Sequence, residues 1–270
     1  MIPNVLSIAG SDPSGGAGIQ ADLKVISALG GYAMAVITAA TAQNTQGVRA
    51  VSALSPAFVA DQIDAIFEDI AVDAVKVGMV ANAGIAEAVA DRLAHHRPAH
   101  IVVDPVMMSK SGHALLDVEA AAVVRDRLVP LATILTPNLP EAAVLLDTML
   151  SWTDAEMRAR VPDLRALGPQ WVLLKGGHLD GPECTDILHG EGCTRAFSVR
   201  RIGTRRTHGT GCTLSAALAT LLPQHPVLES VGLAKRYLTG AIVAADALDV
   251  GRGHGPLHHF HALWAERAAP

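Results

Sequence analysis

The sequence predicts an α/β protein, a three-layer α/β/α sandwich with a mostly parallel central sheet. Short apolar runs alternate along the chain with longer segments of helical periodicity. Half of the 270 residues are apolar and 17% are charged, while aromatic residues make up only 3%. The apolar bulk therefore comes from Ala, Val, Leu and Ile, a composition typical of helices packed on a parallel sheet. A chain of this kind can bury one large core, so we expect a single domain over residues 1–270.

The elements of the first half follow from apolar spacing and from glycines. An apolar run predicts a strand over 5–9, and a glycine-rich loop follows over 10–18. Apolar residues at helical spacing, ended by Gly30 and Gly31, predict a helix over 19–29. The same signals predict strands over 32–40, 74–77 and 101–104 and helices over 56–70, 82–96 and 118–129. The most apolar stretch, 33–42, suits a buried strand.

The second half continues this alternation and then changes rhythm. Periodicity predicts strands over 133–135 and 171–174 and helices over 138–148, 153–167, 211–222 and 227–249. Between them, 185–189 and 196–201 flank a turn at Gly190 to Gly192 and predict a β-hairpin. In sheets of this class, ligands bind at the carboxyl ends of the strands, and the polar and glycine motifs of this chain follow those ends.

Charge and cysteine content exclude several classes of protein. Lys and Arg minus Asp and Glu is 21 − 26 = −5, without a basic run, so we expect no nucleic-acid groove and no patch for anionic membranes. The three cysteines form no Cys-x-x-Cys pair, and the amino terminus lacks a basic-then-apolar leader, which predicts reduced thiols in the cytoplasm. No window approaches 18 uncharged apolar residues, so no membrane span is expected.

The segment Gly209-Thr210-Gly211-Cys212 precedes a predicted helix and is the strongest chemical motif. Its glycines allow backbone N–H groups to converge, and the helix dipole adds a positive end, which together suit a transferring phosphoryl group. An ordinary capped glycine turn is the alternative. Cys212 at that helix start is either a thiolate of lowered pKa that accepts a proton or a small buried apolar residue.

Acidic residues follow two predicted strands, and a lysine ends a third. Asp104 is either a metal or base group or a cap on the next turn. Asn138 and Glu141 have the spacing of a capping box, and Glu141 could in addition hold Mg²⁺ through water. Lys175 ends its strand where it could meet a phosphate.

Two further motifs carry weaker signals. The loop 11–18 could cradle phosphate, but its glycines do not match the dinucleotide-binding spacing, so a pocket wall is an equal interpretation. The histidines His258, His259 and His261 lack a metal-site spacing, and packing or solvated surface is the preferred interpretation.

With its motifs taken in order, the chain resembles the hydroxymethylpyrimidine/phosphomethylpyrimidine kinases of the ribokinase-like superfamily over nearly its whole length. The resemblance is carried jointly by IAGSDPSGGAGIQADLK, TAQNTQGV, VKVGM, DPVM with SKSGHALL, LTPNLPEA, LLKGGH, THGTGCTLSAALA, AKRYLTGAI and GHGPLHHFH. It implies an ATP- and Mg²⁺-dependent kinase that phosphorylates 4-amino-5-hydroxymethyl-2-methylpyrimidine on its alcohol and then phosphorylates the monophosphate. It also implies a homodimer.

The resemblance assigns roles to individual residues. Gln43 recognises the aminopyrimidine edge, because an amide offers both a donor and an acceptor. The ring pocket is lined by Gly10, Ala17, Met79 and Val106, with Asp22 as a nearby polar contact. Gly209, Thr210 and Gly211 form the anion hole, and Cys212 takes the place of the aspartate base of sugar kinases. Phosphate and Mg²⁺ groups are Asp104, Glu141 and Lys175, with Lys235 added for phosphate.

A physical reason suggests itself for the cysteine. The alcohol step must lose a proton, whereas the monophosphate acceptor is already anionic and would be repelled by a fixed carboxylate. A thiol can stay neutral in the second step. Three alternatives remain open at this point: a pyridoxal kinase of the same superfamily, a non-catalytic pyrimidine sensor and a sugar kinase.

Overall fold

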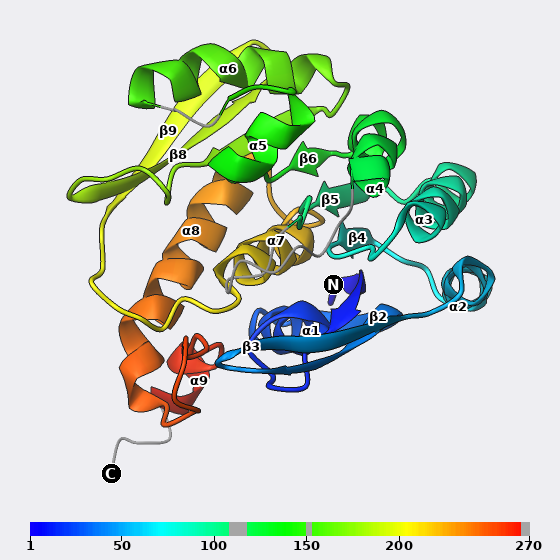
Figure 1. Ribbon diagram of the computed structural model, residues 1–270, viewed down its shortest axis with the longest axis horizontal. Coiled ribbons are helices and arrows are strands. Elements are labelled where there is room, and N and C mark those ends of the chain that lie inside the picture. The colour runs from blue at the N-terminus through cyan, green and yellow to red at the C-terminus, as the bar shows by residue number, and fades with distance from the viewer. Residues whose placement is uncertain (108–117, 150–152, 266–270) are drawn as a thin grey trace.

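A mixed sheet of nine strands runs through the middle of the computed structural model, which describes residues 1–107, 118–149 and 153–265 (Figure 1). The strand order is β3-β2-β1-β4-β5-β6-β7-β8-β9. Neighbours from β2 to β7 are parallel, while β3 and the β8–β9 hairpin add antiparallel edges. The strands are β1 Asn4–Ser11, β2 Tyr32–Asn44, β3 Gly47–Ala53, β4 Ala74–Val77, β5 His100–Val103, β6 Ile134–Leu135, β7 Trp171–Lys175, β8 Glu183–Gly190 and β9 Cys193–Arg200.

Helices cover both faces of this sheet, which gives the three layers that the sequence predicts. One face carries α1 Gly18–Ala28, α7 Thr210–Leu221 and α8 Val227–Val243. The other carries α2 Pro56–Phe67, α3 Ala83–His96, α4 Val118–Val123, α5 Leu139–Leu145 and α6 Asp154–Ala166. A short α9, His261–Ala265, lies near the carboxyl end of the described chain. None of the described helices is both long and apolar enough to cross a bilayer.

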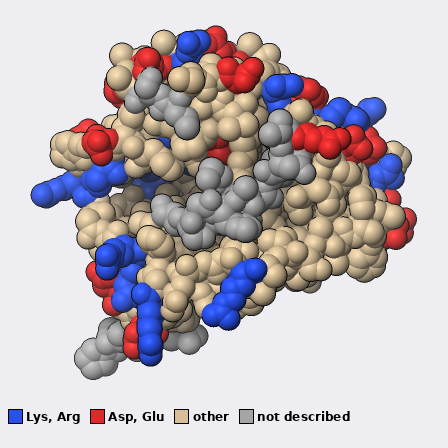
Figure 2. Space-filling view, viewed as in Figure 1, with Lys and Arg blue, Asp and Glu red and all other residues tan. Residues whose placement is uncertain are grey.

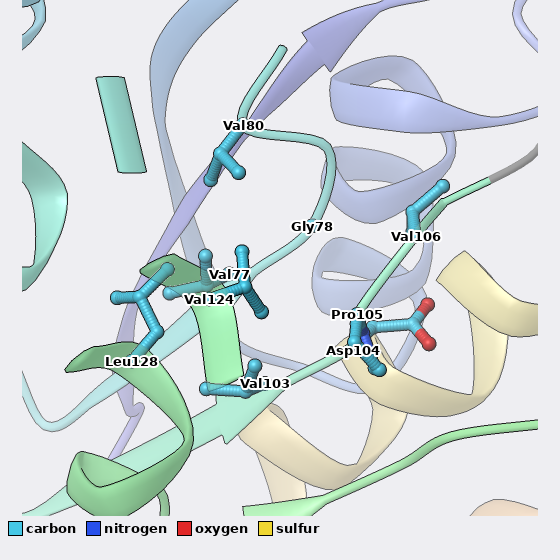
Figure 3. A pocket seen from close by; sticks show the side chains of 9 residues that line it. All are labelled: Val77, Gly78, Val80, Val103, Asp104, Pro105, Val106, Val124 and Leu128. Atoms are coloured by element: carbon cyan, nitrogen blue, oxygen red, sulfur yellow. The ribbon is translucent and has the colours of Figure 1, made fainter. Parts of the chain in front are cut away.

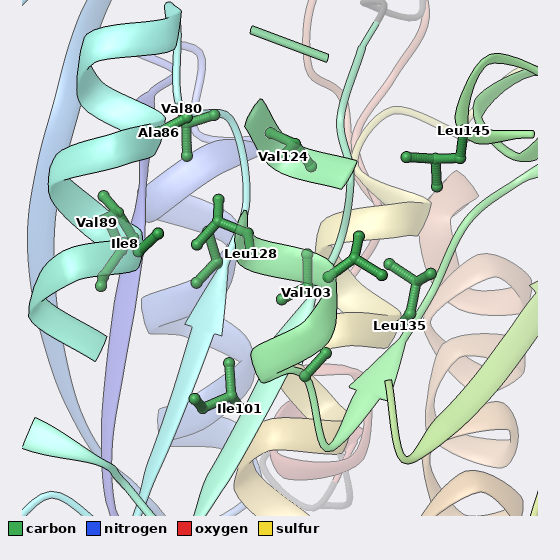
Figure 4. Packing of buried hydrophobic residues seen from close by; sticks show 14 of the residues in the cluster. Ile8, Val80, Ala86, Val89, Ile101, Val103, Val124, Leu128, Leu135 and Leu145 are labelled. Atoms are coloured by element: carbon green, nitrogen blue, oxygen red, sulfur yellow. The ribbon is translucent and has the colours of Figure 1, made fainter. Parts of the chain in front are cut away.

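Each helical layer has its own apolar core against the sheet. Val5, Val102 and Leu173 lie on the α1/α7 side with the buried alanines of α7. On the opposite side, Ile8, Val103 and the aliphatic residues of α3 pack together (Figure 4). Burying both faces of β1, β4 and β5 explains why these strands are short, uninterrupted apolar runs.

The structure departs from the predicted elements in three places. The strand β3 was not predicted, because its residues from Arg49 to Ala53 are exposed and carry no buried-face alternation. Strand β2 is buried on one face only, whereas the apolar composition of 33–42 predicts a buried strand. The predicted helix 118–129 is divided into α4, a π-helical turn and a 3-10 turn that contains Pro130.

The tip between β2 and β3 is held by the chain beyond α8. The backbone of His254 donates to the Thr45 carbonyl at 2.9 Å, and that of Gly253 donates to the Thr45 hydroxyl at 3.2 Å. A Cβ on Gly253 would lie 2.0 Å from the Thr45 carbonyl oxygen, so only glycine permits this approach. The end of β2 is therefore fixed by residues some two hundred positions away.

On the molecular face drawn in Figure 2, basic and acidic side chains of the described residues are interspersed around the rim. No continuous basic groove is formed on this face by the residues that are described. Cys184, Cys193 and Cys212 are all free thiols.

Candidate active site

The start of α7 lies where the central strands end. Gly209 has a φ of 85°, and a Cβ there would be 1.9 Å from the carbonyl oxygen of Gly16. Thr210, Gly211 and Cys212 form the first turn of the helix, with their N–H groups at its positive end. Glycine at 209 is therefore required both by its conformation and by the contact with the loop 10–18.

A carboxylate–lysine cluster lies beside this helix start. A Cβ on Gly211 would be 3.2 Å from Asp104 Oδ2 and 3.5 Å from Lys175 Nζ. Lys175 Nζ donates to Asp104 Oδ1 at 2.9 Å and lies 3.9 Å from Glu141 Oε2. Figure 3 shows the Asp104 carboxylate at the end of β5, beside a narrow apolar recess. The structure thus brings Asp104, Glu141, Lys175 and the 209–212 segment together.

The two carboxyl groups of the cluster have pKa values that are shifted in opposite directions. Burial alone would raise the pKa of Asp104, but Lys175 and Lys76 outweigh it and leave this pKa below the ordinary value. Burial and the negative charge of Asp104 raise the pKa of Glu141 from 4.5 to about 7. A carboxyl group that is reluctant to ionise in this way suits a site that receives a cation. Two nearby carboxyl groups are also what a largely hydrated Mg²⁺ requires of a protein.

The capping box predicted for Asn138 and Glu141 is confirmed. The Glu141 N–H donates to the Asn138 side chain at 2.9 Å, and the Asn138 N–H donates to Glu141 Oε2 at 2.8 Å. The cap engages Oε2, which is also the oxygen that lies 3.9 Å from Lys175 Nζ, and it does not use Oε1. Capping and cation binding are therefore compatible roles for Glu141.

Of the two interpretations left open for Cys212, the one with a lowered pKa is contradicted by the structure. Burial raises the pKa of this thiol to about 11, and this outweighs the positive charge of Lys76 and a hydrogen bond from the Gly18 N–H. Cys212 nonetheless keeps part of its surface exposed at the start of α7. The residue is therefore a neutral thiol at neutral pH.

Gly10 and Met79, two of the predicted ring-pocket residues, lie against each other, whereas Val106 lines the same recess as Asp104. A Cβ on Gly10 would lie 2.3 Å from Met79 Cε, so these two residues are in contact. Gln43, near the end of β2, lies with its Nε2 3.4 Å from His208 Nε2. Since His208 directly precedes Gly209, the amide of Gln43 faces the same site as the 209–212 segment. Ala17 is the residue immediately before α1, and Val106 follows Asp104 in the recess of Figure 3.

Two predicted site residues are placed differently. Asp22 is fully buried, and its Oδ2 accepts from Lys76 at 2.8 Å and from Ser7 at 2.6 Å. It therefore offers no exposed surface for direct contact with a ligand. Lys235 is buried in an ion pair with Asp186, which also accepts from the Gly176 N–H at 3.1 Å. Asp186 thus links Lys235 to Gly176, the residue after Lys175, and the ammonium of Lys235 is already paired and not free to bind a phosphate.

Sequence analysis missed Asp12, Lys76 and His208. Lys76 is fully buried, and the charge of Asp22 raises its pKa despite the cost of burial. His208 Nε2 lies 2.7 Å from Asp12 Oδ2. The position of His208 next to the glycine motif was the available signal.

The carboxy-terminal histidines are packed into the structure. His259 Nε2 lies 3.1 Å from Thr213 Oγ1, and burial lowers the pKa of His259 to about 3. Within the described ranges, no group of three or more His, Cys, Asp or Glu is placed to hold a metal. The motif SKSGHALL, residues 109–116, lies outside the described residues.

Comparison with known proteins identifies similar chains. The family model described as phosphomethylpyrimidine kinase matches residues 12–258. A hydroxymethylpyrimidine/phosphomethylpyrimidine kinase of Salmonella typhimurium is 52% identical, over 97% of this chain and 98% of its own.

Two solved structures share the fold. A phosphomethylpyrimidine kinase of Clostridium difficile is 46% identical with a TM-score of 0.79, over 90% of this chain and 100% of its own. A pyridoxal kinase of Staphylococcus aureus in complex with AMP-PCP and pyridoxal is 29% identical with a TM-score of 0.88, over 97% of this chain and 94% of its own. Overall shape alone therefore does not choose between the two substrates.

Proposed function

Because the chain belongs to the phosphomethylpyrimidine kinase family, we propose that it transfers the γ-phosphoryl group of ATP twice. The first acceptor is the alcohol of 4-amino-5-hydroxymethyl-2-methylpyrimidine, and the second is the resulting monophosphate, as thiamine biosynthesis requires. One observation carries the proposal. The start of α7 lies between the cluster of Asp104, Glu141 and Lys175 and the side that holds Gln43.

The cluster forms the phosphate side of the proposed site. Phosphoryl transfer depends on alignment and neutralisation of charge more than on covalent help from the protein. Asp104 and Glu141 would hold Mg²⁺ through water, and the ion would neutralise charge on the ATP phosphates. Lys175 is held by Asp104 where its ammonium can meet a phosphate oxygen. In the proposal, the start of α7 supplies the anion hole from the backbone of Thr210, Gly211 and Cys212, and the Thr210 N–H, which donates to the Thr207 carbonyl at 3.4 Å, would turn to the phosphate.

Gln43 and Cys212 define the acceptor side. Gln43 pairs with the ring nitrogen and amino group, while Gly10, Ala17, Met79 and Val106 enclose the flat ring. The alcohol then lies near Cys212, whose thiolate takes its proton in the first step. In the second step the acceptor is already charged, and the neutral thiol does not repel it.

We also propose a cytoplasmic homodimer. The free state of all three cysteines fits a reducing compartment. Arg49 to Ala53 of β3 form an exposed sheet edge, and the unpaired backbone groups of such an edge can pair with a second chain.

Turnover with each acceptor tests the proposed function. ADP formation and product mass are measured with the hydroxymethylpyrimidine, its monophosphate and pyridoxal. We expect both pyrimidines to be phosphorylated with a higher kcat/KM than pyridoxal. A higher kcat/KM for pyridoxal would favour the kinase activity named for the Staphylococcus aureus structure. The absence of pyrimidine-dependent ADP formation would favour a non-catalytic sensor.

A further inference from the structure

His208 is buried between the loop 10–18 and Gln43. Its Nε2 lies 2.7 Å from Asp12 Oδ2 and 3.4 Å from Gln43 Nε2. A Cβ on Gly16 would lie 2.6 Å from His208 Cδ2, so the imidazole packs directly on that glycine. The imidazole thus occupies one fixed place beside the amide of Gln43.

Asp12 determines which ring nitrogen of His208 carries the proton. The Asp12 carboxylate accepts from the Ser14 N–H at 2.9 Å, the Ser14 hydroxyl at 2.7 Å and the Ala17 N–H at 2.9 Å. Burial alone would raise its pKa, but the hydrogen bonds from His208 and Ser14 leave this pKa below the ordinary value. An ionised carboxylate only accepts, so the Nε2 of His208 must bear a proton and donate it to Asp12.

This proton fixes the orientation of the Gln43 amide. With the amide nitrogen toward His208, two N–H donors would face each other at 3.4 Å. In addition, the single hydroxyl proton of Thr41 would have to serve both the Ser11 carbonyl at 2.9 Å and Gln43 Oε1 at 3.2 Å. A rotation of the amide by half a turn removes both conflicts. The oxygen then lies beside the His208 N–H, whose proton is donated mainly to Asp12 and whose positive end also attracts the amide oxygen. The nitrogen donates to the Thr41 hydroxyl, and that hydroxyl donates to Ser11.

We propose that Asp12 and His208 are positioning residues that fix the Gln43 amide with its oxygen toward His208, and so make the site selective for rings that carry an amino group beside the ring nitrogen. The inference rests on the proposed function, in which Gln43 contacts the ring. In this orientation the amide retains an oxygen lone pair for the amino group and one N–H for the ring nitrogen. A pyridoxal-type ring offers no amino donor next to its ring nitrogen, so the oxygen of the fixed amide would be left unpaired.

Two substitutions of His208 and one of Thr41 test the proposal. His208→Leu removes the N–H donor, His208→Gln keeps a donor for Asp12 and Gln43, and Thr41→Val removes the other partner of the amide. We measure kcat and KM for the hydroxymethylpyrimidine, for pyridoxal and for ATP, together with the melting temperature.

For His208→Leu we expect the ratio of kcat/KM between the pyrimidine and pyridoxal to fall by about tenfold, the equivalent of about 1.4 kcal/mol. The loss should lie in the KM of the pyrimidine, while its kcat and the KM of ATP stay within about threefold. His208→Gln should restore the ratio to within about threefold of the unmodified protein, and Thr41→Val should lower it as His208→Leu does.

A fall in kcat with unchanged KM and unchanged selectivity would overturn the proposal, because His208 would then act on the neighbouring anion hole. Equal losses in His208→Leu and His208→Gln would also overturn it, since packing alone would explain them. If His208→Leu shows no cooperative melting, Thr41→Val decides: retained selectivity there refutes the inference.

Gln43→Ala separates this inference from the proposed function. If Gln43→Ala abolishes selectivity and both His208→Leu and Thr41→Val preserve it, ring recognition by Gln43 stands and the positioning role fails. If Gln43→Ala itself leaves the pyrimidine KM unchanged, the recognition assigned to Gln43 in the proposed function fails.

Discussion

The pH dependence of the alcohol step tests the role of Cys212. The thiol has a pKa of about 11, so about one molecule in a thousand carries the thiolate at about pH 8, and each further pH unit raises this fraction about tenfold. If the thiolate takes the alcohol proton, kcat for the hydroxymethylpyrimidine should rise about tenfold per pH unit above about pH 8. The monophosphate acceptor needs no base, so kcat of the second step should stay flat.

Three variants of Cys212 sharpen this expectation. Cys212→Ala should lose about 10²–10⁴-fold in the alcohol step and lose its pH dependence, while the second step changes by less than about threefold. Cys212→Ser controls for size, because its hydroxyl is a much weaker acid, and should behave like Cys212→Ala. Cys212→Asp should restore a base for the alcohol step but slow the second step through repulsion of the charged acceptor.

The assay follows ADP release in each step separately, with the pyrimidine or its monophosphate as the sole acceptor. Rates are compared above about pH 8, because Glu141, with a pKa of about 7, no longer titrates there. Equal losses of both steps in Cys212→Ala would refute the reasoning. So would an alcohol step whose pH dependence survives in that variant.

Three more predictions concern the scaffold of the site. Gly209→Ala places a Cβ 1.9 Å from the Gly16 carbonyl oxygen at a φ of 85°, so kcat/KM of both steps should fall at least about a hundredfold in steady-state assays. The control is Gly203→Ala, whose Cβ meets nothing within 4 Å. Near-normal activity of Gly209→Ala would contradict the anion-hole role. Lys76→Met leaves the buried Asp22 without its cation, so urea denaturation should show a loss of about 3–5 kcal/mol in the free energy of unfolding. The double variant with Asp22→Asn should recover much of this free energy. A loss below about 1 kcal/mol in Lys76→Met would count against a buried ion pair. Because the pKa of Glu141 rises from 4.5 to about 7 on folding, its contribution to stability is full below about pH 4.5 and is lost as the pH rises through about 7, a change of about 3 kcal/mol. Glu141→Gln should abolish this component in denaturation at several pH values, whereas Glu156→Gln, at the same position of an exposed capping box, should leave it; an unaltered pH profile in Glu141→Gln would contradict the raised pKa.

Local signals in the sequence predict local structure well. The capping box of Asn138 and Glu141 depends on residues three positions apart and is present as expected. The glycine motif likewise stands at the start of a helix, because α7 begins at Thr210 and the predicted helix begins at 211. The alternation of apolar runs and helical segments is sufficient to predict the parallel strands at the centre of the sheet.

Features set by distant contacts could not be predicted in this way. The pair of Asp22 and Lys76 joins positions 54 residues apart, and it exists only because α1 lies beneath the neighbouring strands β1 and β4. The raised pKa of Cys212 is set by burial, which a position at the start of a helix does not reveal. His208 meets Asp12 across 196 residues and Gln43 across 165.

The hydrogen bonds between Thr45 and the backbone at 253–254 connect the proposed acceptor side to a surface turn, so that a change in this turn can alter the acceptor side. Thr45 follows Gln43 by two positions, so a changed length or sequence of the turn before Gly255 would shift the amide that we propose to face the heterocycle. Asp104, Glu141 and Lys175, which we propose to meet the phosphates, belong to other segments, whereas the same turn also reaches His208, whose N–H donates to the Gly255 carbonyl at 3.2 Å. A family that retains one phosphate cage could in this way acquire new ring preferences by altering a surface turn remote in sequence from the residues that touch the ring.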